Sequence, residues 1–423
     1  MELTIERVVA WEALDSRGTP TVGCAVVLEG GAEGVAHVPS GASTGSHEAH
    51  ELRDGDARYG GRGVARAVAS VNDAISQLLV GHDAADQEAI DADLRALDGT
   101  EALERLGANA VLSVSVACAL AAASGRGVPL WRSLAPEGPA LLPLPMVNVV
   151  SGGAHAGGVV DIQDVLVVPV GASSFAEALE WAWRARAATA AVLQARGHGS
   201  TLVADEGGLA APGGSSREAV ALVAAGIERS GLVPGEQAAI AIDVAATQLL
   251  DAGSYRLRAE ERGLASAALV DETASWCADF PIVSLEDPLA EDDGGWPAAT
   301  RRLAGLQVVG DDFFATSVDR LEAAIVAGAA NAVLVKPNQC GTVSGARAVV
   351  QRAHAAGYAT VVSARSGDTE DAWLADLAVG WRAGQIKVGS TTRSERTAKW
   401  NRLLRIEAEE PDVVFAGRAT LGR

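Results

Sequence analysis

Short apolar runs alternate with helical patterns through the second two thirds of the chain, and most runs end in a charged or polar residue. Successive run ends lie about 22 to 43 residues apart, which is enough for a strand, a helix and two loops. Repeats of this size predict a (β/α)8 barrel, in which the carboxyl ends of the strands converge on one active site. A doubly wound open sheet is the alternative, although no GxGxxG follows a strand and no GK dipeptide occurs. The residues that end the runs are Glu206, Asp243, Glu286, Asp311, Lys336, Arg365 with Ser366, and Lys387.

The first part of the chain has a different pattern. Strand-like runs with turns near Gly18 and Gly30 come first, and helical patterns follow at 63–81 and 108–127. Strands followed by helices predict an α+β domain. A Pro/Gly-containing segment near 135–145 places the boundary, giving domains 1–137 and 138–423. Small residues in the segment 38–56 predict a lid over an active site, although a plain flexible loop has the same composition.

Composition narrows the class of protein. The 423 residues are 48% hydrophobic and 21% charged, which allows two domains with a sizeable core. A net charge of −20 disfavours a nucleic-acid or anionic-membrane partner. We find no signal-peptide pattern at the N-terminus and no apolar run of the roughly 18 residues that a membrane span needs. With four widely spaced cysteines, these features predict a cytoplasmic protein with free thiols.

The cations are distributed unevenly. Of 34 lysine and arginine residues only three are lysine, so lysine should mark places where arginine cannot serve. Lys336 and Lys387 end strand-like runs, and we interpret both as functional. Lys399 lies in an amphipathic helical pattern, and we interpret it as a solvated residue.

Three carboxylates at consecutive strand ends indicate a metal. Asp243, Glu286 and Asp311 would repel one another without a cation, and oxygen ligands of this kind suit Mg²⁺. The alternative is that each acid caps the following helix. Beside a dication, the pKa of Lys336 should fall towards the range of a general base, and Glu206 among other carboxylates should keep its proton and act as an acid. This set suits removal of a proton α to a carboxylate.

These residues lie within stretches that resemble the enolase (phosphopyruvate hydratase) family along nearly the whole chain. The matching stretches include LDSRGTPTV, VPSGASTGSHEAHELRDGD, ADEGGLAAP, SLEDPLAEDD, VLVKPNQCGTVS, SARSGDTEDAWLADLAVG and GQIKVGS. The resemblance implies a small α+β domain on an eight-stranded barrel, a homodimer and two Mg²⁺ ions. It also implies a small phosphorylated or phosphonylated carboxylic acid as substrate.

The resemblance also implies a role for each matching position. Asp243, Glu286 and Asp311 match the ligands of the first metal, and Ser43 matches a lid serine that reaches the second. Lys336 matches the base, Glu206 the acid, and Lys387 the lysine on the substrate carboxylate. The remaining matches are Arg365 and Ser366 as phosphate binders, His155 near the phosphate, Gln163, His47 and, at the position of a catalytic-site glutamate, Asp164.

Two departures from the family pattern bear on the substrate. Ala364 stands where the family has histidine before the Arg-Ser pair, and Asp164 is one methylene shorter than the usual glutamate. Losing the histidine should weaken phosphate binding by roughly 1.5–3 kcal/mol and leave room beside the phosphorus. Three hypotheses remain: an ordinary glycolytic enolase, a paralogue such as carboxyphosphonoenolpyruvate synthase acting in phosphonate biosynthesis, and a catalytically silent binding protein. The sequence favours the paralogue, because both changes fall at the substrate.

Overall fold

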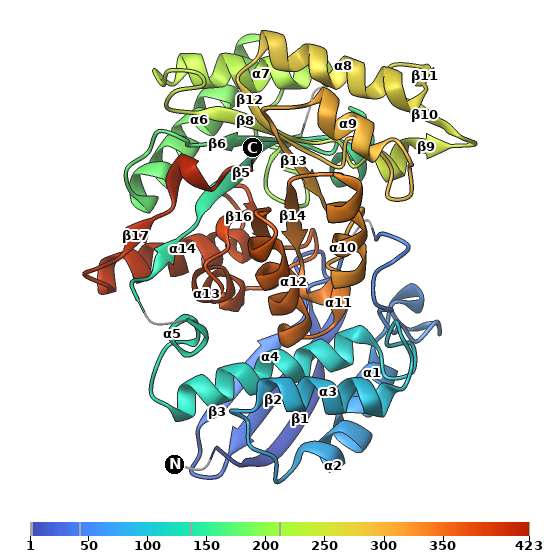
Figure 1. The fold of residues 1–423 in the computed structure, drawn as a ribbon, viewed down its shortest axis with the longest axis vertical. Helices are drawn as coiled ribbons and strands as arrows, with labels where there is room; N and C mark the ends of the chain where they lie inside the picture. Colours follow the sequence, from blue (N-terminus) through green and yellow to red (C-terminus); the bar gives the residue numbers. More distant parts are fainter. Residues whose placement is uncertain (1–2, 42–43, 136–137, 211–212, 423) are drawn as a thin grey trace.

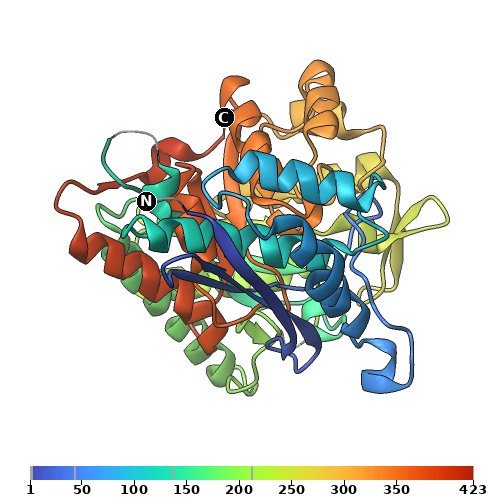
Figure 2. The ribbon, with the colours of Figure 1, turned by 90° about the horizontal axis from the view of Figure 1, so that it is seen from below.

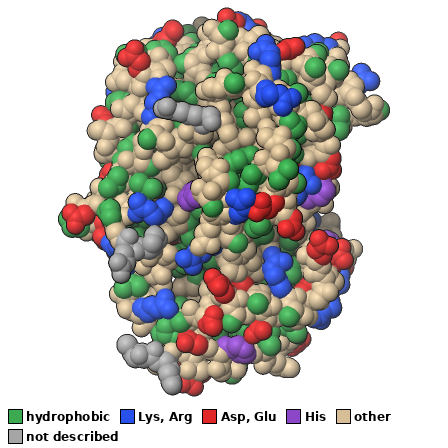
Figure 3. Space-filling model, in the orientation of Figure 1, with side chains coloured by type: hydrophobic (Ala, Val, Ile, Leu, Met, Phe, Trp, Pro, Cys, Tyr) green, Lys and Arg blue, Asp and Glu red, His purple; other side chains and the backbone are tan. Residues whose placement is uncertain are grey.

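The chain forms a small domain beneath a large barrel domain (Figure 1). The structure is a computed structural model, and it describes residues 3–41, 44–135, 138–210 and 213–422. The predicted boundary at 137/138 therefore falls partly outside the described residues, and the division into 1–137 and 138–423 stays a prediction. On the face drawn in Figure 3, acidic and basic side chains are interspersed.

The N-terminal domain is a three-stranded antiparallel sheet covered by helices. Strands β1, β2 and β3 pair in that order, and α4 packs against β2 and β3 (Figure 2). Alternating apolar residues of the strands and almost the whole of α4 are buried, which gives this domain its core. The elements are β1 (Ile5–Leu14), β2 (Pro20–Leu28), β3 (Glu33–His37), α1 (Ala65–Ser70), α2 (Ser76–Leu79), α3 (Gln87–Asp98), α4 (Ala108–Gly125) and α5 (Leu130–Leu134).

Helix α4 differs from the expectation that no apolar segment is long enough to span a membrane. It has 18 residues with a mean hydropathy of 1.6, so by length and composition it could cross a membrane. The expectation that no segment reaches this length was therefore wrong. Because 83% of the helix is buried between the sheet and its neighbours, it is packed as a core helix.

Eight strands close the barrel. Their order is β5, β6, β8, β12, β13, β14, β15 and β16, and β16 pairs with β5 to complete the ring. Inward residues such as Leu166, Leu334 and Val361 fill its centre, while the other faces pack on the surrounding helices. The strands are β5 (Leu144–Ser151), β6 (Asp164–Val168), β8 (Ala239–Asp243), β12 (Ile282–Glu286), β13 (Gln307–Gly310), β14 (Ala332–Val335), β15 (Ala359–Ser363) and β16 (Gly384–Gly389).

Helices surround the ring, and this domain also contains several short strands outside it. The helices are α6 (Phe175–Ala195), α7 (Ser216–Arg229), α8 (Ser266–Asp279), α9 (Trp296–Arg302), α10 (Val318–Ala327), α11 (Pro337–Cys340), α12 (Val343–Ala355), α13 (Trp373–Gly380) and α14 (Ser394–Glu409). The short strands are β4 (Leu141–Leu142), β7 (Leu209–Ala210), β9 (Leu250–Asp251), β10 (Ser254–Leu257), β11 (Arg262–Leu264) and β17 (Val414–Phe415).

The barrel confirms the predicted fold class, with two differences from a uniform repeat. Strand β6 runs antiparallel to both β5 and β8, so the ring is not built from parallel βα units throughout. The run expected to end at Glu206 forms no barrel strand, and Glu206 lies on the loop that precedes β7. Apolar runs alone do not reveal strand direction, because the side-chain period is the same in both directions.

Candidate active site

Five of the eight barrel strands bring the predicted residues to one mouth. Asp243 ends β8 and Glu286 ends β12, and these two residues are directly paired in the sheet register. Asp311 follows β13 and Lys336 follows β14. Lys387 lies within β16. The sequence therefore placed four of these residues correctly at strand ends, because each terminates a buried apolar run, whereas β16 continues two residues beyond Lys387.

Lys387 binds two of the predicted metal ligands. Its Nζ donates to Asp243 Oδ2 at 2.7 Å and to both carboxylate oxygens of Glu286 at 2.8 Å. Burial lowers the pKa of Lys387, but these two carboxylates outweigh it and raise the pKa well above its usual range. Burial and the charge of Asp243 raise the pKa of Glu286. Three carboxylate oxygens thus converge on one cation, a donor set that fits a hard dication.

Asp311 is paired with the other lysine. Lys336 donates from Nζ to Asp311 Oδ2, and Gln339 donates to Asp311 Oδ1 at 2.9 Å. Burial lowers the pKa of Lys336, but the charge of Asp311 outweighs burial and the pKa is raised. The lowered pKa was expected with a dication beside Lys336; with Asp311 as its partner, the pKa is raised instead.

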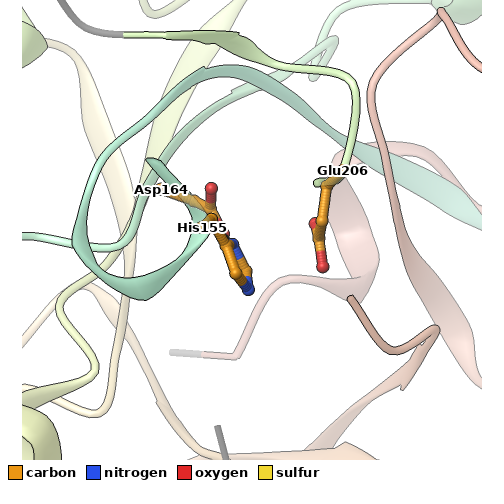
Figure 4. Close-up of side chains that lie close together, drawn as sticks. All are labelled: His155, Asp164 and Glu206. Atoms are coloured by element: carbon orange, nitrogen blue, oxygen red, sulfur yellow. The ribbon is translucent and has the colours of Figure 1, made fainter. Parts of the chain in front are cut away.

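A second cluster lies beside the first, because Asp164 on β6 is the register partner of Asp243 on β8 (Figure 4). His155, Asp164 and Glu206 each bring one ligand-type atom within 4.8 Å of the others. Asp164 accepts hydrogen bonds from Asn148 and Ser151, and His155 Nδ1 lies 3.0 Å from its Oδ2. The shorter carboxylate at position 164 is therefore fully engaged by its neighbours, and Ser151 supplies one of the contacts.

Charge within this cluster sets its protonation. Burial lowers the pKa of His155, but the charges of Asp164 and Glu206 raise it to about 9. Burial raises the pKa of Glu206, yet the charges of His155 and Arg396 outweigh burial and lower it. Glu206 was expected to keep its proton among carboxylates; instead, cations dominate its surroundings. Its Oε2 is buried and has no hydrogen-bond partner among the described residues, so it is available to a ligand.

Arg365 and Ser366 follow β15 beside the lid segment. Arg365 is buried and its guanidinium contacts Glu48, with Nη1 to Oε2 at 2.9 Å. Glu48 and Arg365 both line a cavity of about 370 Å³ between the lid segment and the barrel. The arginine that is expected to bind an anion is thus held by a carboxylate of the lid segment.

Ala364 does not face this cavity. Its side chain is 4% exposed and belongs to the apolar core cluster, while its backbone N–H donates to Lys387 O at 2.9 Å. The cavity is lined by Arg365 and not by Ala364. The small side chain is therefore accommodated by packing against its apolar neighbours.

Of the remaining predicted residues, one lies in the site, one lies at its rim, and one is outside the described residues. Gln163 donates to Asp243 Oδ2 at 3.1 Å, so it lies in the site. His47 lies at the rim, where its Nε2 is 2.9 Å from Asp292. Ser43 lies outside the described residues.

Comparison with known proteins agrees with this geometry. A family model described as "Enolase, C-terminal TIM barrel domain" matches residues 139–422, and "Enolase, N-terminal domain" matches residues 5–134. A protein named "Enolase" from Acidothermus cellulolyticus (strain ATCC 43068 / DSM 8971 / 11B) is 49% identical over 422 residues, which cover 99% of this chain and 98% of that protein. The chain belongs to the enolase family. It is accordingly a hydro-lyase of the enolase type, from a family that depends on magnesium.

Three residues around the enolase-type mouth were not predicted. Glu48 contacts Arg365, and Arg396 and Lys399 on α14 are buried beneath the same loop. Lys399 is 1% exposed, so its interpretation as a solvated residue was wrong. A helical pattern does not show which face meets the barrel. The scarcity of lysine was the signal that could have identified Lys399.

Proposed function

We propose that this enolase removes water from 2-phosphoglycerate to give phosphoenolpyruvate. One observation carries the proposal: an acid-rich cluster with two lysines lies close enough to Glu206 for the charges of both lysines to lower its pKa, and the charge of the buried Arg365 acts on Lys336. A substrate with a carboxylate, an α-proton and a phosphate matches these three features. Membership of the family and the relative named "Enolase" support the same reaction.

The chain would supply the proton transfers. Lys336 Nζ, once it has lost its own proton, takes the proton from the carbon next to the carboxylate. Glu206, whose pKa is lowered, must first take up a proton; it then gives that proton to the hydroxyl on the neighbouring carbon, the carbon–oxygen bond breaks, and water leaves as the new double bond forms. Lys387 orients the substrate carboxylate, and Arg365 with Ser366 binds the phosphate.

The acidic residues would hold magnesium. Asp243, Glu286 and Asp311 offer oxygen donors of the kind that Mg²⁺ prefers, and Mg²⁺ bound there would neutralise negative charge on the carboxylate. Ser43 would reach a second ion, as the resemblance implies. Mg²⁺ would also compete with Lys387 and Lys336 for these carboxylates, which would release the ammonium groups for the substrate.

The structure bears on the choice of substrate. A bulkier phosphorus acid was favoured on the ground that Ala364 leaves space, yet Ala364 is packed in the core and does not line the cavity. Asp164 likewise has three neighbouring partners. The relative named "Enolase", 49% identical to this chain, supports an ordinary enolase substrate over that of a phosphonate paralogue. A silent binding protein would have no need for both lysines, the three acids and Glu206.

A direct assay tests the proposal. Purified protein with Mg²⁺ and 2-phosphoglycerate should form the enol product, followed by its ultraviolet absorbance, with kcat in the usual enzyme range of about 1–10³ s⁻¹. A chelator should abolish the signal, and added Mg²⁺ should restore it. A rate lower by orders of magnitude that still responds to the chelator would show that the substrate is another phosphorus acid.

We also propose that the protein is a cytoplasmic homodimer, as the resemblance implies. Gel filtration with light scattering would measure its mass, and a monomer mass of 43.1 kDa would contradict the dimer.

A further inference from the structure

The third lysine of the chain is as buried as the two in the site. Lys399 is 1% exposed, and all its Nζ protons have acceptors: Asp368 Oδ1 at 2.8 Å, Thr369 O at 2.6 Å and Glu395 O at 2.9 Å. Two of these acceptors belong to the loop 365–369, which begins with the anion-binding pair. An ammonium group suits three acceptors arranged around one point, whereas a planar guanidinium does not.

Arg396 lies one helical turn before Lys399, on the same face of α14. Its side chain is fully buried, and Nη1 donates to the backbone oxygens of Arg365 at 2.6 Å and Val388 at 3.0 Å. Its Nη2 donates at 2.5 Å to the backbone oxygen of Ser366. One guanidinium therefore joins the end of β15 to β16, next to Lys387.

The same loop is held from its other side by the N-terminal domain. Gly367 and Ser40 exchange two backbone hydrogen bonds of 2.6 and 2.9 Å, and Ser16 N donates to Asp368 O at 2.8 Å. Ser40 lies at the start of the lid segment. The loop 365–369 is thus fixed between α14 on one side and the base of the lid segment on the other.

We infer that Arg396 and Lys399 are positioning residues for the anion site. They hold the backbone of the loop 365–369 so that Arg365 and Ser366 present their side chains to the phosphate, and neither touches the substrate itself. The inference rests on the proposed function for the identity of the anion. It predicts that loosening the loop weakens anion binding more than it slows the chemical step, because Lys336 and Glu206 lie on other elements.

The test uses two variants at the lysine. Lys399→Met combined with Asp368→Asn removes both charges, so that no buried carboxylate is left unpaired. Asp368→Asn alone keeps the lysine and its two backbone acceptors and serves as the milder variant. Calorimetry in Mg²⁺ measures the dissociation constant of inorganic phosphate, and steady-state assays measure KM and kcat.

The matched control removes another ion pair from the same helix. Arg402 donates to both oxygens of Asp376, at 2.7 and 2.6 Å, and makes no contact with the loop among the described contacts. Arg402→Met combined with Asp376→Asn should lower the melting temperature without changing phosphate binding. This control separates loss of stability from loss of loop position.

The double variant at 399 and 368 should weaken phosphate binding and raise KM by about tenfold, with kcat within about twofold. The milder variant should shift both in the same direction by less. Unchanged phosphate binding in both variants would overturn the inference, and so would an equal loss in the Arg402 control. Wild-type protein that binds phosphate but does not convert 2-phosphoglycerate would refute the proposed substrate, and the phosphate comparison would still decide the inference. Wild-type protein that does not bind phosphate would overturn the inference whatever its turnover.

Discussion

The two halves of the barrel mouth are charged in opposite ways. In the half formed by β8 to β14, five acidic side chains accompany Lys336, and Lys387 reaches them from β16. In the half formed by the end of β15 and α14, three cations each contact one carboxylate: Arg365 contacts Glu48, Lys399 contacts Asp368, and Arg396 lies 3.5 Å from Glu395. The acidic side chains are Asp243, Glu286, Asp287, Asp311 and Asp312.

The difference teaches how an acidic protein can bind an anion. Burial and neighbouring carboxylates raise the pKa of Glu286 and Asp287 well above their usual range and that of Asp312 to about 7, so the two lysines do not balance the crowded acids of this half. In the basic half, Arg396 and Lys399 donate most of their hydrogen bonds to backbone oxygens, which carry no formal charge. Their positive charge is therefore only partly balanced by carboxylates. The first half therefore favours a dication, and the second favours an anion such as phosphate.

The largest effect should come from the acidic half. Lys336→Ala should lower kcat for 2-phosphoglycerate by about 10²–10⁴-fold, because the proton acceptor is lost. Calorimetry should find phosphate affinity within about twofold of the wild type, since the basic half is untouched. An equal loss of phosphate binding would show that the two halves do not act separately.

The next effect concerns His155, between the halves. Its pKa is raised from 6.5 to about 9, so it stabilises the fold fully below about pH 6.5 and loses that contribution as pH rises through about 9. His155→Gln should therefore cost up to about 3 kcal/mol in urea unfolding at low pH and much less above pH 9. His354, whose pKa burial lowers, is the control: its removal should be most favourable at low pH. A cost for His155→Gln that does not vary with pH would contradict the assignment.

Ala364→His tests the packing of the basic half. The larger ring would enter a buried position, which should lower stability by about 1–3 kcal/mol. Turnover of 2-phosphoglycerate should not rise. A strong rise in turnover, measured with the melting temperature on the same sample, would show that the pocket had been adapted to another substrate.

The smallest effect concerns the lid segment. Glu48→Gln removes the carboxylate that holds Arg365, and phosphate should then bind about tenfold more tightly. Glu51→Gln is the control, because Glu51 contacts Arg53 at 2.6 Å instead. Equal affinity in both variants, measured by calorimetry, would mean that Glu48 does not compete with the anion.

The sequence predicted the acidic half better than the basic half. Five residues that meet in the acidic half each end or interrupt a buried apolar run: Asp243, Glu286, Asp311, Lys336 and Lys387. Such positions can be recognised in the sequence because barrel strands are short and apolar. The contacts of α14 were not predicted for two reasons. They depend on which face of the helix meets the barrel, and they use backbone oxygens, whose positions cannot be inferred from the pattern of side chains. The protonation states of Lys336 and Glu206 could not be predicted from the sequence either, because the pKa of each depends on which charges become its neighbours after folding.

The pairing of β16 with β5 has a consequence for the order of events during synthesis. The two strands lie about 240 residues apart, and their register joins Leu144 to Gln385. At about 5–20 residues per second, a ribosome needs roughly 12–50 s to make the intervening chain. During that interval the free edge of β5 has unpaired backbone groups that can pair with other strands. The nascent chain is thus most exposed to misassembly before its last barrel strand emerges.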